Sequence, residues 1–413
     1  MTKGKFQFLA TTAVMALVGF TNQAAMAQDA PSNTQLEQRI EALEAEVQQS
    51  EMNSAAAANA APAAPSTGWW DNTTLSGRMY FDLTNITNHA NGVRLATAQS
   101  STSGATNGNG TNFDIKRLYL GVDHTFNDMF AADATTDLTY DATTGASQIF
   151  VKKAYLQAKI DPMLTVRVGS ADLPWIPYVE GIYGYRWLEK TLTDYYSQGT
   201  SADWGVHALG SFFDGIVNYQ FSAVNGGGYK KAPIGGDVNR FNQLDYEGRI
   251  SLAYEGFNLA AGGYTGKLGT PSGVPTFHTA KRIDVLGAYV ADGIRVGVEY
   301  FNSNDDSAAL VQSSTTGDGA NGISAFGSWM FIPDFSIFGR FDVEDPNDKT
   351  VPTRKSTYFN VGLDWTPVKT VDLSIAYKHD GTSNGAVSTA NGTIGGTING
   401  AYNEIGVFGD WQF

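Results

Sequence analysis

The sequence lacks cysteine, has few charged residues and, beyond its first residues, contains no apolar run long enough to cross a membrane as a helix. Of its 413 residues 16% are charged, whereas soluble domains average about 25%. The absence of cysteine excludes disulfides, thiolate metal sites and cysteine nucleophiles, and the absence of apolar runs of about 20 residues excludes a helical membrane bundle. With 46 glycines, 12% aromatic residues and a mean hydropathy of −0.21, two classes remain. One is a large β-rich soluble protein; the other is a barrel whose apolar and polar residues alternate.

The first residues have the three parts of a secretory signal peptide. Lys3 and Lys5 give a basic start, residues 8–20 are apolar, and Ala25-Met26-Ala27 is a cleavage site of small residues. The apolar part is too short to span a membrane. We therefore predict that residues 1–27 are removed and that the mature chain is periplasmic, secreted or in an outer membrane.

A heptad pattern follows over residues 34–49. Apolar residues spaced by four, three and four positions form its stripe, namely Leu36, Ile40, Leu43 and Val47. Two heptads are marginal for a single helix, so the stripe indicates several copies meeting, and a solvated amphipathic helix is the alternative. An Ala- and Pro-rich linker comes next. We interpret residues 28–68 as a periplasmic coiled-coil segment and linker.

From residue 73 to the end, side chains alternate with the period of two that is typical of strands. Sixteen segments are predicted, each near the 9–11 residues with which a tilted strand crosses a bilayer. They are 73–83, 113–126, 129–140, 148–160, 163–171, 203–212, 215–224, 243–254, 257–266, 279–290, 294–303, 321–332, 335–344, 356–365, 370–380 and 401–413. The predicted fold of residues 69–413 is therefore an all-β, transmembrane, antiparallel β-barrel of about 16 strands.

The connections between these segments alternate in length. Short turns such as Asn127-Asp128, Asp292-Gly293 and Thr366-Pro367-Val368 are separated by long loops rich in Gly, Ser, Thr and Asn. An outer-membrane barrel has short periplasmic turns and long external loops, whereas a soluble sandwich has no reason for this asymmetry. Aromatic residues also lie near both ends of the apolar face, where they would meet the two membrane interfaces.

The interior predicted for this barrel is polar and charged. A barrel of about 16 strands is wide enough for an aqueous channel, and charges inside a membrane protein need water or partners. Seven basic residues are predicted to line the pore, namely Arg78, Arg117, Lys153, Arg167, Arg249, Arg295 and Arg340.

One long connection, residues 172–203, differs from the others because it is rich in aromatic and large aliphatic residues, including Trp175, Tyr183 and Trp187. It follows the fifth strand and is therefore the third external loop. We predict that it folds into the barrel and narrows the channel; a surface flap or a subunit contact is the alternative. Its charged residues are the candidate constriction residues, namely Glu180, Arg186, Glu189, Lys190 and Asp194.

Taken together, these features resemble known families of bacterial porins. The barrel with an inward third loop is similar to the general bacterial porins, and RVGSADLPWIPYVEGIYGYRWLEKTLTDYYSQGTSADWGVHALGSF resembles the phosphate-selective porin O and P family. The terminal strand, ending with Trp411 and Phe413, resembles the signal that the barrel-assembly machinery reads. The resemblance implies a homotrimer that passes small hydrophilic solutes through the outer membrane, in contact with lipid and lipopolysaccharide. Loop 172–203 carries a net charge of −3, however, so phosphate specificity is not expected.

Basic and acidic groups are predicted to oppose each other across the pore. The bases are Arg78, Arg117, Lys153 and Arg167, and the acids are Glu180, Glu189 and Asp194. Such an arrangement creates a transverse field that sorts ions by sign. The alternative is that the bases pair with wall neighbours such as Asp82, Asp123 and Asp137.

Two other functions compete with a passive channel. An outer-membrane enzyme needs a Ser/His or Asp/His constellation, and the five histidines are scattered without such a motif. A structural tether would use the helix at 34–49. The sequence predicts no enzyme activity, no cofactor and no metal site, and a formal net charge of −14 makes nucleic acid a poor partner.

Overall fold

The computed structural model describes residues 68–95, 109–140, 145–231, 240–241, 243–272, 274, 276, 278–305 and 317–413. Residues from Gly68 to Phe413 form one compact unit. The predicted signal peptide, 1–27, and the predicted coiled-coil segment and linker, 28–68, lie outside the described residues except for Gly68.

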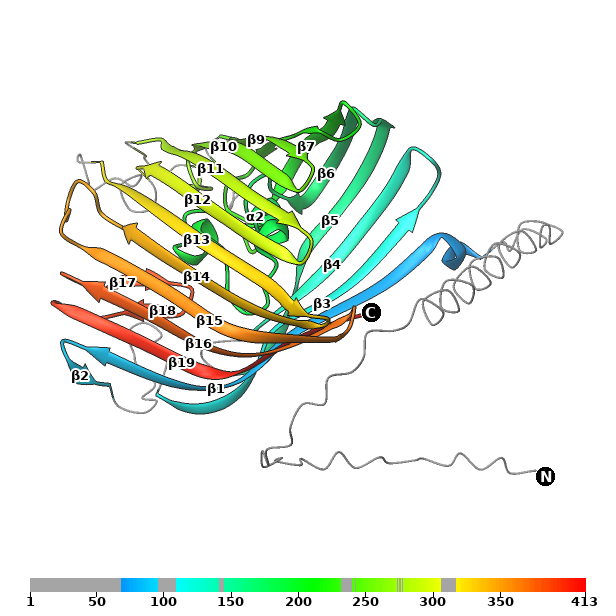
Figure 1. Cartoon of the computed structure of the whole chain (residues 1–413). Helices are drawn as coiled ribbons and strands as arrows, with labels where there is room; N and C mark the ends of the chain where they lie inside the picture. Colours follow the sequence, from blue (N-terminus) through cyan, green and yellow to red (C-terminus); the bar gives the residue numbers. More distant parts are fainter. Residues whose placement is uncertain are drawn as a thin grey trace, which may run out of the picture. The chain divides into compact units, whose positions relative to one another are not determined.

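Sixteen antiparallel strands form a closed barrel (Figure 1). Each strand pairs with the strands before and after it in the ring, and β19 pairs with β1 over 13 positions to close the ring. The strands are β1 (Thr73–Ala90), β3 (Gly110–Thr125), β4 (Phe130–Tyr140), β5 (Ser147–Asp161), β6 (Leu164–Asp172), β7 (Ala202–Phe212), β8 (Val217–Val224), β9 (Asp245–Tyr254), β10 (Phe257–Gly266), β11 (Ala280–Ala291), β12 (Ile294–Asn304), β13 (Gly319–Ile332), β14 (Phe335–Asp345), β15 (Lys355–Val368), β16 (Val371–Ser383) and β19 (Asn399–Gln412).

The remaining elements are short. They are η1 (Trp69–Asn72), β2 (Val93–Arg94), α2 (Ile176–Tyr183), α3 (Leu192–Tyr195), β17 (Val387–Thr389) and β18 (Gly392–Ile394). Both α2 and α3 lie in the connection from β6 to β7, and β17 and β18 form a hairpin between β16 and β19. Among the residues described, no helix is long and apolar enough to cross a membrane.

The prediction of sixteen barrel strands is confirmed, with two corrections at strand ends. β1 continues beyond residue 83 to Ala90, because its polar second half pairs with β19. The predicted turn Thr366-Pro367-Val368 is wrong: β15 runs through Val368, and the turn is at residues 369–370. Pro367 is tolerated because it lies at a register shift, where its missing N–H removes no ladder hydrogen bond.

The two faces of the barrel differ in chemistry. The outward face exposes aliphatic side chains in mid-strand, such as Ile250, Ile283 and Val285, and aromatic side chains nearer the strand ends, such as Phe257 and Phe341. The inward face buries polar and charged side chains, which include Asp82, Asp137, Glu299, Arg340, Lys378 and Glu404. An apolar exterior with aromatic rims and a polar interior is the arrangement of a membrane-spanning barrel.

The first and last strands meet at a tight contact between Gly77 and Phe413. Their backbones exchange hydrogen bonds in both directions, at 3.2 Å and 3.0 Å. A Cβ added at Gly77 would lie 2.2 Å from the Phe413 ring, which also stacks on Trp411 with centroids 5.7 Å apart. The ring of Phe413 therefore occupies the space beside Gly77, where β1 has no side chain.

We predict that Gly77→Val weakens barrel closure, because its branched side chain overlaps the Phe413 ring. Overpacking of this kind destabilises by about 1–3 kcal/mol. The measurement is the temperature at which the folded barrel loses its fast electrophoretic migration, which should fall.

Gly287→Val is the matched control, since an added Cβ there meets only Leu259 at an ordinary 3.6 Å. Adding Phe413→Ala to Gly77→Val should restore part of the lost stability. An equal loss for Gly77→Val and Gly287→Val would contradict the overlap.

Candidate functional site

The 172–203 loop contacts the inner surface of the barrel and fixes its first turn there with two carboxylates. The backbone N–H of Trp175 donates to Glu247 of β9 at 3.1 Å. The indole N–H of Trp175 donates to Glu299 of β12 at 3.0 Å, and the hydroxyl of Thr193 donates to the same oxygen at 3.0 Å. Both halves of the loop are therefore attached to one buried carboxylate.

Basic side chains of the same wall bind backbone carbonyl groups of the loop. Arg249 donates to Pro174 at 2.7 Å, and Arg295 donates to Gly181 at 2.9 Å. Arg340 donates to Lys190, and Lys378 of β16 donates to Leu188 at 2.8 Å. Three of the seven predicted pore-lining bases, Arg249, Arg295 and Arg340, thus hold the loop.

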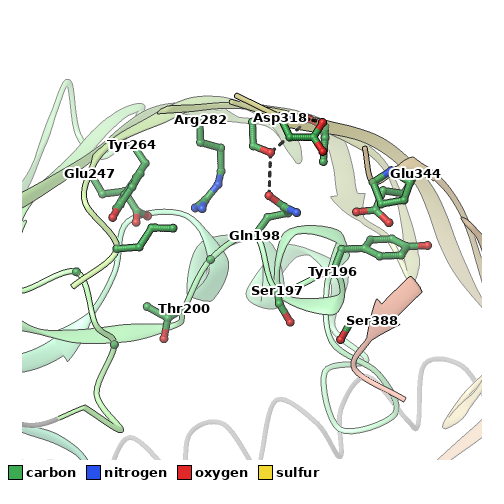
Figure 2. A pocket seen from close by; sticks show the side chains of 18 of the residues that line it. Tyr196, Ser197, Gln198, Thr200, Glu247, Tyr264, Arg282, Asp318, Glu344 and Ser388 are labelled. Carbon is green, nitrogen blue, oxygen red and sulfur yellow. Dashed lines mark hydrogen bonds between the residues drawn. The ribbon is translucent and has the colours of Figure 1, made fainter. Parts of the chain in front are cut away.

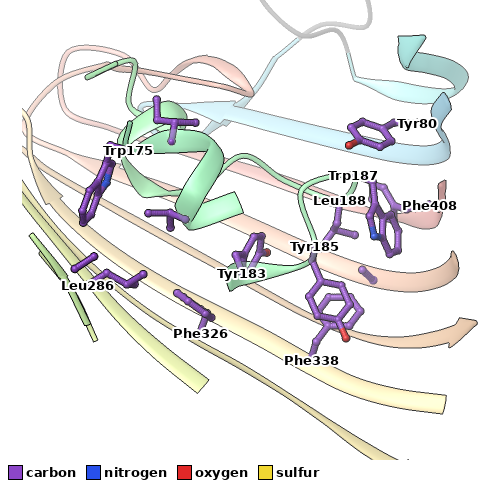
Figure 3. Packing of buried hydrophobic residues seen from close by; sticks show 14 residues of the cluster. Tyr80, Trp175, Tyr183, Tyr185, Trp187, Leu188, Leu286, Phe326, Phe338 and Phe408 are labelled. Atoms are coloured by element: carbon purple, nitrogen blue, oxygen red, sulfur yellow. The ribbon is translucent and has the colours of Figure 1, made fainter. Parts of the chain in front are cut away.

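Apolar packing reinforces these bonds (Figure 3). The buried cluster joins the loop to inward-facing residues of the wall, and it comprises Trp175, Ile176, Val179, Tyr183, Tyr185, Trp187 and Leu188 with Tyr80, Ala260, Leu286, Phe326, Phe338, Ala376 and Phe408. The ring of Tyr185 stacks on Phe338 with centroids 4.4 Å apart. This explains why the loop is rich in aromatic residues, unlike the other connections.

The hairpin β17–β18 covers the second half of the loop. Val387 packs in a buried cluster with Leu192, Tyr195 and Tyr358. Asn391 donates to Tyr195 at 3.0 Å and to Glu189 at 3.2 Å. The connection between the last two strands therefore also reaches into the barrel.

Within the loop, most predicted constriction residues pair with one another. Arg186 is 2.5 Å from Glu180 and 3.8 Å from Asp194, and Lys190 is 2.8 Å from Asp194. Burial disfavours the charged carboxylate of Asp194, but Lys190 and Arg186 outweigh burial and hold its pKa below the ordinary value. Glu189 pairs with Lys378 at 3.5 Å instead.

The other four predicted bases lie on β1 to β6 and contact side chains of the wall; of the neighbours named in the alternative interpretation, only Asp137 is among these partners. Arg78 is 2.5 Å from Asp410, and Arg117 is 2.6 Å from Asp137. The other contacts join Lys153 to Asp133 at 3.9 Å and to Asp172 at 3.6 Å, and Arg167 to Gln157 at 2.9 Å. In the pair of Arg78 and Asp410, 39% of the basic side chain is exposed and 2% of the acidic one. This pair therefore presents positive charge to the interior, whereas in the pair of Lys153 and Asp172 the acid is the more exposed partner.

The loop cluster and the β1–β6 wall also interact across the interior. Arg117 interacts electrostatically with Arg186 and Asp194 of the loop. Lys230, in the connection after β8, interacts with Arg117 and Lys190; partial burial and Arg117 lower its pKa.

Sequence reasoning missed three basic residues on this side, namely Lys116, Lys152 and Lys230. Lys116 lies 3.1 Å from Asp82, and Lys152 lies 4.5 Å from the centre of the Tyr119 ring. In a strictly alternating strand, the side chains of Lys116 and Lys152 would face outward. Each of the two lysines lies at a register shift, which turns its side chain inward. Two consecutive basic residues, in Lys116-Arg117 and in Lys152-Lys153, are the sequence signal at both places.

A cavity of about 590 Å³ lies between loop residues 196–200 and the external ends of β9 to β14 (Figure 2). Gln198 accepts a hydrogen bond from Ser303 at 2.8 Å beside it. Its charged lining residues have both signs and include Lys231, Glu247, Arg282 and Glu344. In the part of the chain that is described, no group of three or more acidic or histidine side chains could hold a metal ion.

Comparison with known proteins identifies the fold. No family model and no curated protein matches the sequence. Solved structures do match, each over 83% of this chain. The outer membrane channel DcaP of Acinetobacter baumannii has a TM-score of 0.56 and 13% identity over 97% of its own chain. An anion-selective porin from Comamonas acidovorans has a TM-score of 0.54 and 11% identity over 99% of its chain, and OmpT, an outer membrane protein of Vibrio cholerae, has a TM-score of 0.52 and 12% identity over 97% of its chain. The chain has the barrel fold of bacterial porins. At these identities the likeness concerns the fold alone.

We predict that Glu299→Ala loosens the loop, because the Trp175 indole and the Thr193 hydroxyl lose their shared acceptor. An unsatisfied buried group costs about 1–3 kcal/mol. The thermal unfolding temperature of the purified barrel should fall.

Glu299→Gln keeps an acceptor oxygen at the same place and should retain most of the stability. If Glu299→Ala unfolds at the wild-type temperature, the shared carboxylate does not hold the loop.

Proposed function

We propose that the protein is an outer-membrane porin, a water-filled channel through which ions and small hydrophilic solutes diffuse passively. The observation that carries the proposal is the closed sixteen-strand barrel with an apolar exterior and a charged interior. A barrel of this size is too wide for wall side chains alone to fill, and charged groups such as Arg78 and Lys153 need water around them.

The channel is narrowed by the 172–203 loop. Its contacts with Glu247, Glu299, Arg340 and Lys378 support this role, because they hold the loop against one side of the interior. The passage then lies between the loop cluster Glu180, Arg186, Lys190 and Asp194 and the bases of β1 to β6. A transverse field across this passage sorts solutes by charge and dipole.

The setting of the channel follows from the same interpretation. Residues 1–27 direct export, residues 28–68 lie in the periplasm, and the barrel meets outer-membrane lipid and lipopolysaccharide. Trp411 and Phe413 form the C-terminal signal for the barrel-assembly machinery. The assembly is a homotrimer, in keeping with OmpT of Vibrio cholerae, which has a trimer form. The motif around the loop supports a relationship to the phosphate-selective porin O and P family, without its phosphate specificity.

We predict that a thiol at position 181 blocks the channel once it is modified. Gly181 is exposed on α2, and an added Cβ there meets no atom within 4 Å. The wild-type chain has no cysteine, so Gly181→Cys carries the only thiol. A charged methanethiosulfonate reagent should lower its single-channel current in a planar bilayer in discrete steps.

Lys349→Cys, on the exposed connection after β14, is the control: it should react without loss of current. Unchanged current through modified Gly181→Cys would place the loop away from the narrowest point. A wild-type barrel that is folded but does not conduct would refute the porin itself.

A further inference from the structure

Two β-bulges interrupt the wall in mid-strand, both at consecutive basic residues. On β3, Arg117 lies opposite Tyr80 and Ile115 lies opposite Phe81, so Lys116 is the extra residue. On β5, Lys153 lies opposite Thr135 and Val151 lies opposite Thr136, so Lys152 is extra. Among the described strand pairs, the other register shifts lie at turns.

Each bulge changes which residues face outward. Phe113 and Ile115 share odd numbers with Arg117 and would face the interior in a regular strand. Because of the bulge Phe113 is exposed on the outside, while Arg117 binds Asp137 inside. A bulge adds one residue and reverses the alternation beyond it.

The same reversal occurs on β5. Ile149 and Val151 are exposed on the outside, whereas Lys153 contacts Asp133 inside. The bulges thus keep apolar residues outside while two adjacent bases turn inward at each place.

Both extra lysines reach inward-facing partners. Lys116 Nζ is 3.1 Å from Asp82; 39% of the Lys116 side chain is exposed, against 2% of the Asp82 side chain. Lys152 Nζ lies 3.4 Å from the Tyr119 hydroxyl, and the Tyr119 ring packs edge-on against Tyr80. The two lysines therefore add positive charge to the part of the interior that Arg78 and Arg117 line.

The contacts of the loop cluster and of the wall beside it contain more bases than acids. Three bases meet three acids, since Arg117 pairs with Asp137, Arg186 with Glu180 and Asp194, and Lys190 with Asp194. Lys152 and Lys230 add two bases, which lie over the rings of Tyr119 and Phe150, so these groups together carry two positive charges. Lys116 lies 3.1 Å from the buried carboxylate of Asp82 and offsets its charge. Without Lys116 and Lys152, each of the two bulges would carry one positive charge fewer.

We propose that Lys116 and Lys152, turned inward by the two bulges, make the passage selective for small anions. The proposal rests on the porin function and names the solutes that the channel prefers. Its physical basis is that Asp82 and Asp410 are buried in ion pairs, whereas their basic partners Lys116 and Arg78 are accessible to the solute. The negative net charge of the whole chain does not act at the passage.

The test is the reversal potential of single channels in a potassium chloride gradient. Wild-type channels should prefer chloride. One unit charge about 5 Å from an ion in water changes the occupancy of that ion about fourfold, in opposite directions for chloride and potassium. Lys152→Gln and Lys116→Gln should therefore each lower the chloride-to-potassium permeability ratio by roughly sixteenfold. Asp194→Asn should change the ratio in the opposite direction, and Lys152→Arg should keep the wild-type ratio.

Lys281→Gln is the matched control, because Lys281 is exposed on the outward face of β11 beside Ile283. It removes the same charge from the chain and should leave the ratio unchanged. Potassium-selective wild-type channels, or equal ratios for Lys152→Gln and Lys281→Gln, would overturn the anion preference while the porin function stands. Folded wild-type barrels without conductance would instead refute the porin function.

Discussion

The attachment of the 172–203 loop to one side of the barrel interior is the constraint on which the rest of the structure depends. Glu247, Glu299, Arg340 and Lys378 are buried on that side, and a buried charge without partners is strongly destabilising. Arg340 and Lys378 have acidic partners in the wall, Asp342 at 2.5 Å and Glu404 at 3.2 Å, and the loop adds backbone carbonyl acceptors for both. For Glu247 and Glu299 the loop supplies the Trp175 and Thr193 donors. The wall also supplies apolar side chains, against which the aromatic side chains of the loop pack.

This attachment divides the interior into two unlike halves. On the side of β9 to β16, charged side chains such as Glu299, Arg340 and Lys378 bind the loop. On the side of β1 to β6, ion pairs such as Arg78 with Asp410 leave the base accessible and the acid buried. The same residue types therefore have different roles: Arg340 is a structural anchor, whereas Arg117 faces the passage.

The sequence predicts the barrel well because each strand must expose one apolar face, and this alternation is local. Strand number, most turn positions and the unusual loop could be identified in this way. A strictly alternating pattern does not predict the bulges at Lys116 and Lys152, because each bulge reverses the alternation. A reversal of the apolar phase between Ile115 and Leu118, and again between Val151 and Ala154, was nevertheless present in the sequence.

The partners of the loop could not be predicted, because they depend on which strands face each other across the barrel. Arg249, Arg295 and Arg340 have the same inward position in the alternating pattern as Arg117, and only the closed ring shows that they meet carbonyl groups of the loop. Similarly, the contact of Asn391 with Glu189 joins residues 202 positions apart. Such contacts follow from topology and register rather than from local sequence.

The most direct test of the central claim is to measure which neutral polymers enter the conducting barrel. Single-channel current is recorded in the presence of polyethylene glycols of increasing size, because a polymer that enters the channel lowers its conductance. A channel narrowed by the loop should conduct in uniform steps and exclude all but the smallest polymers. Entry of polymers as wide as an empty sixteen-strand barrel, or the absence of any conductance, would contradict it.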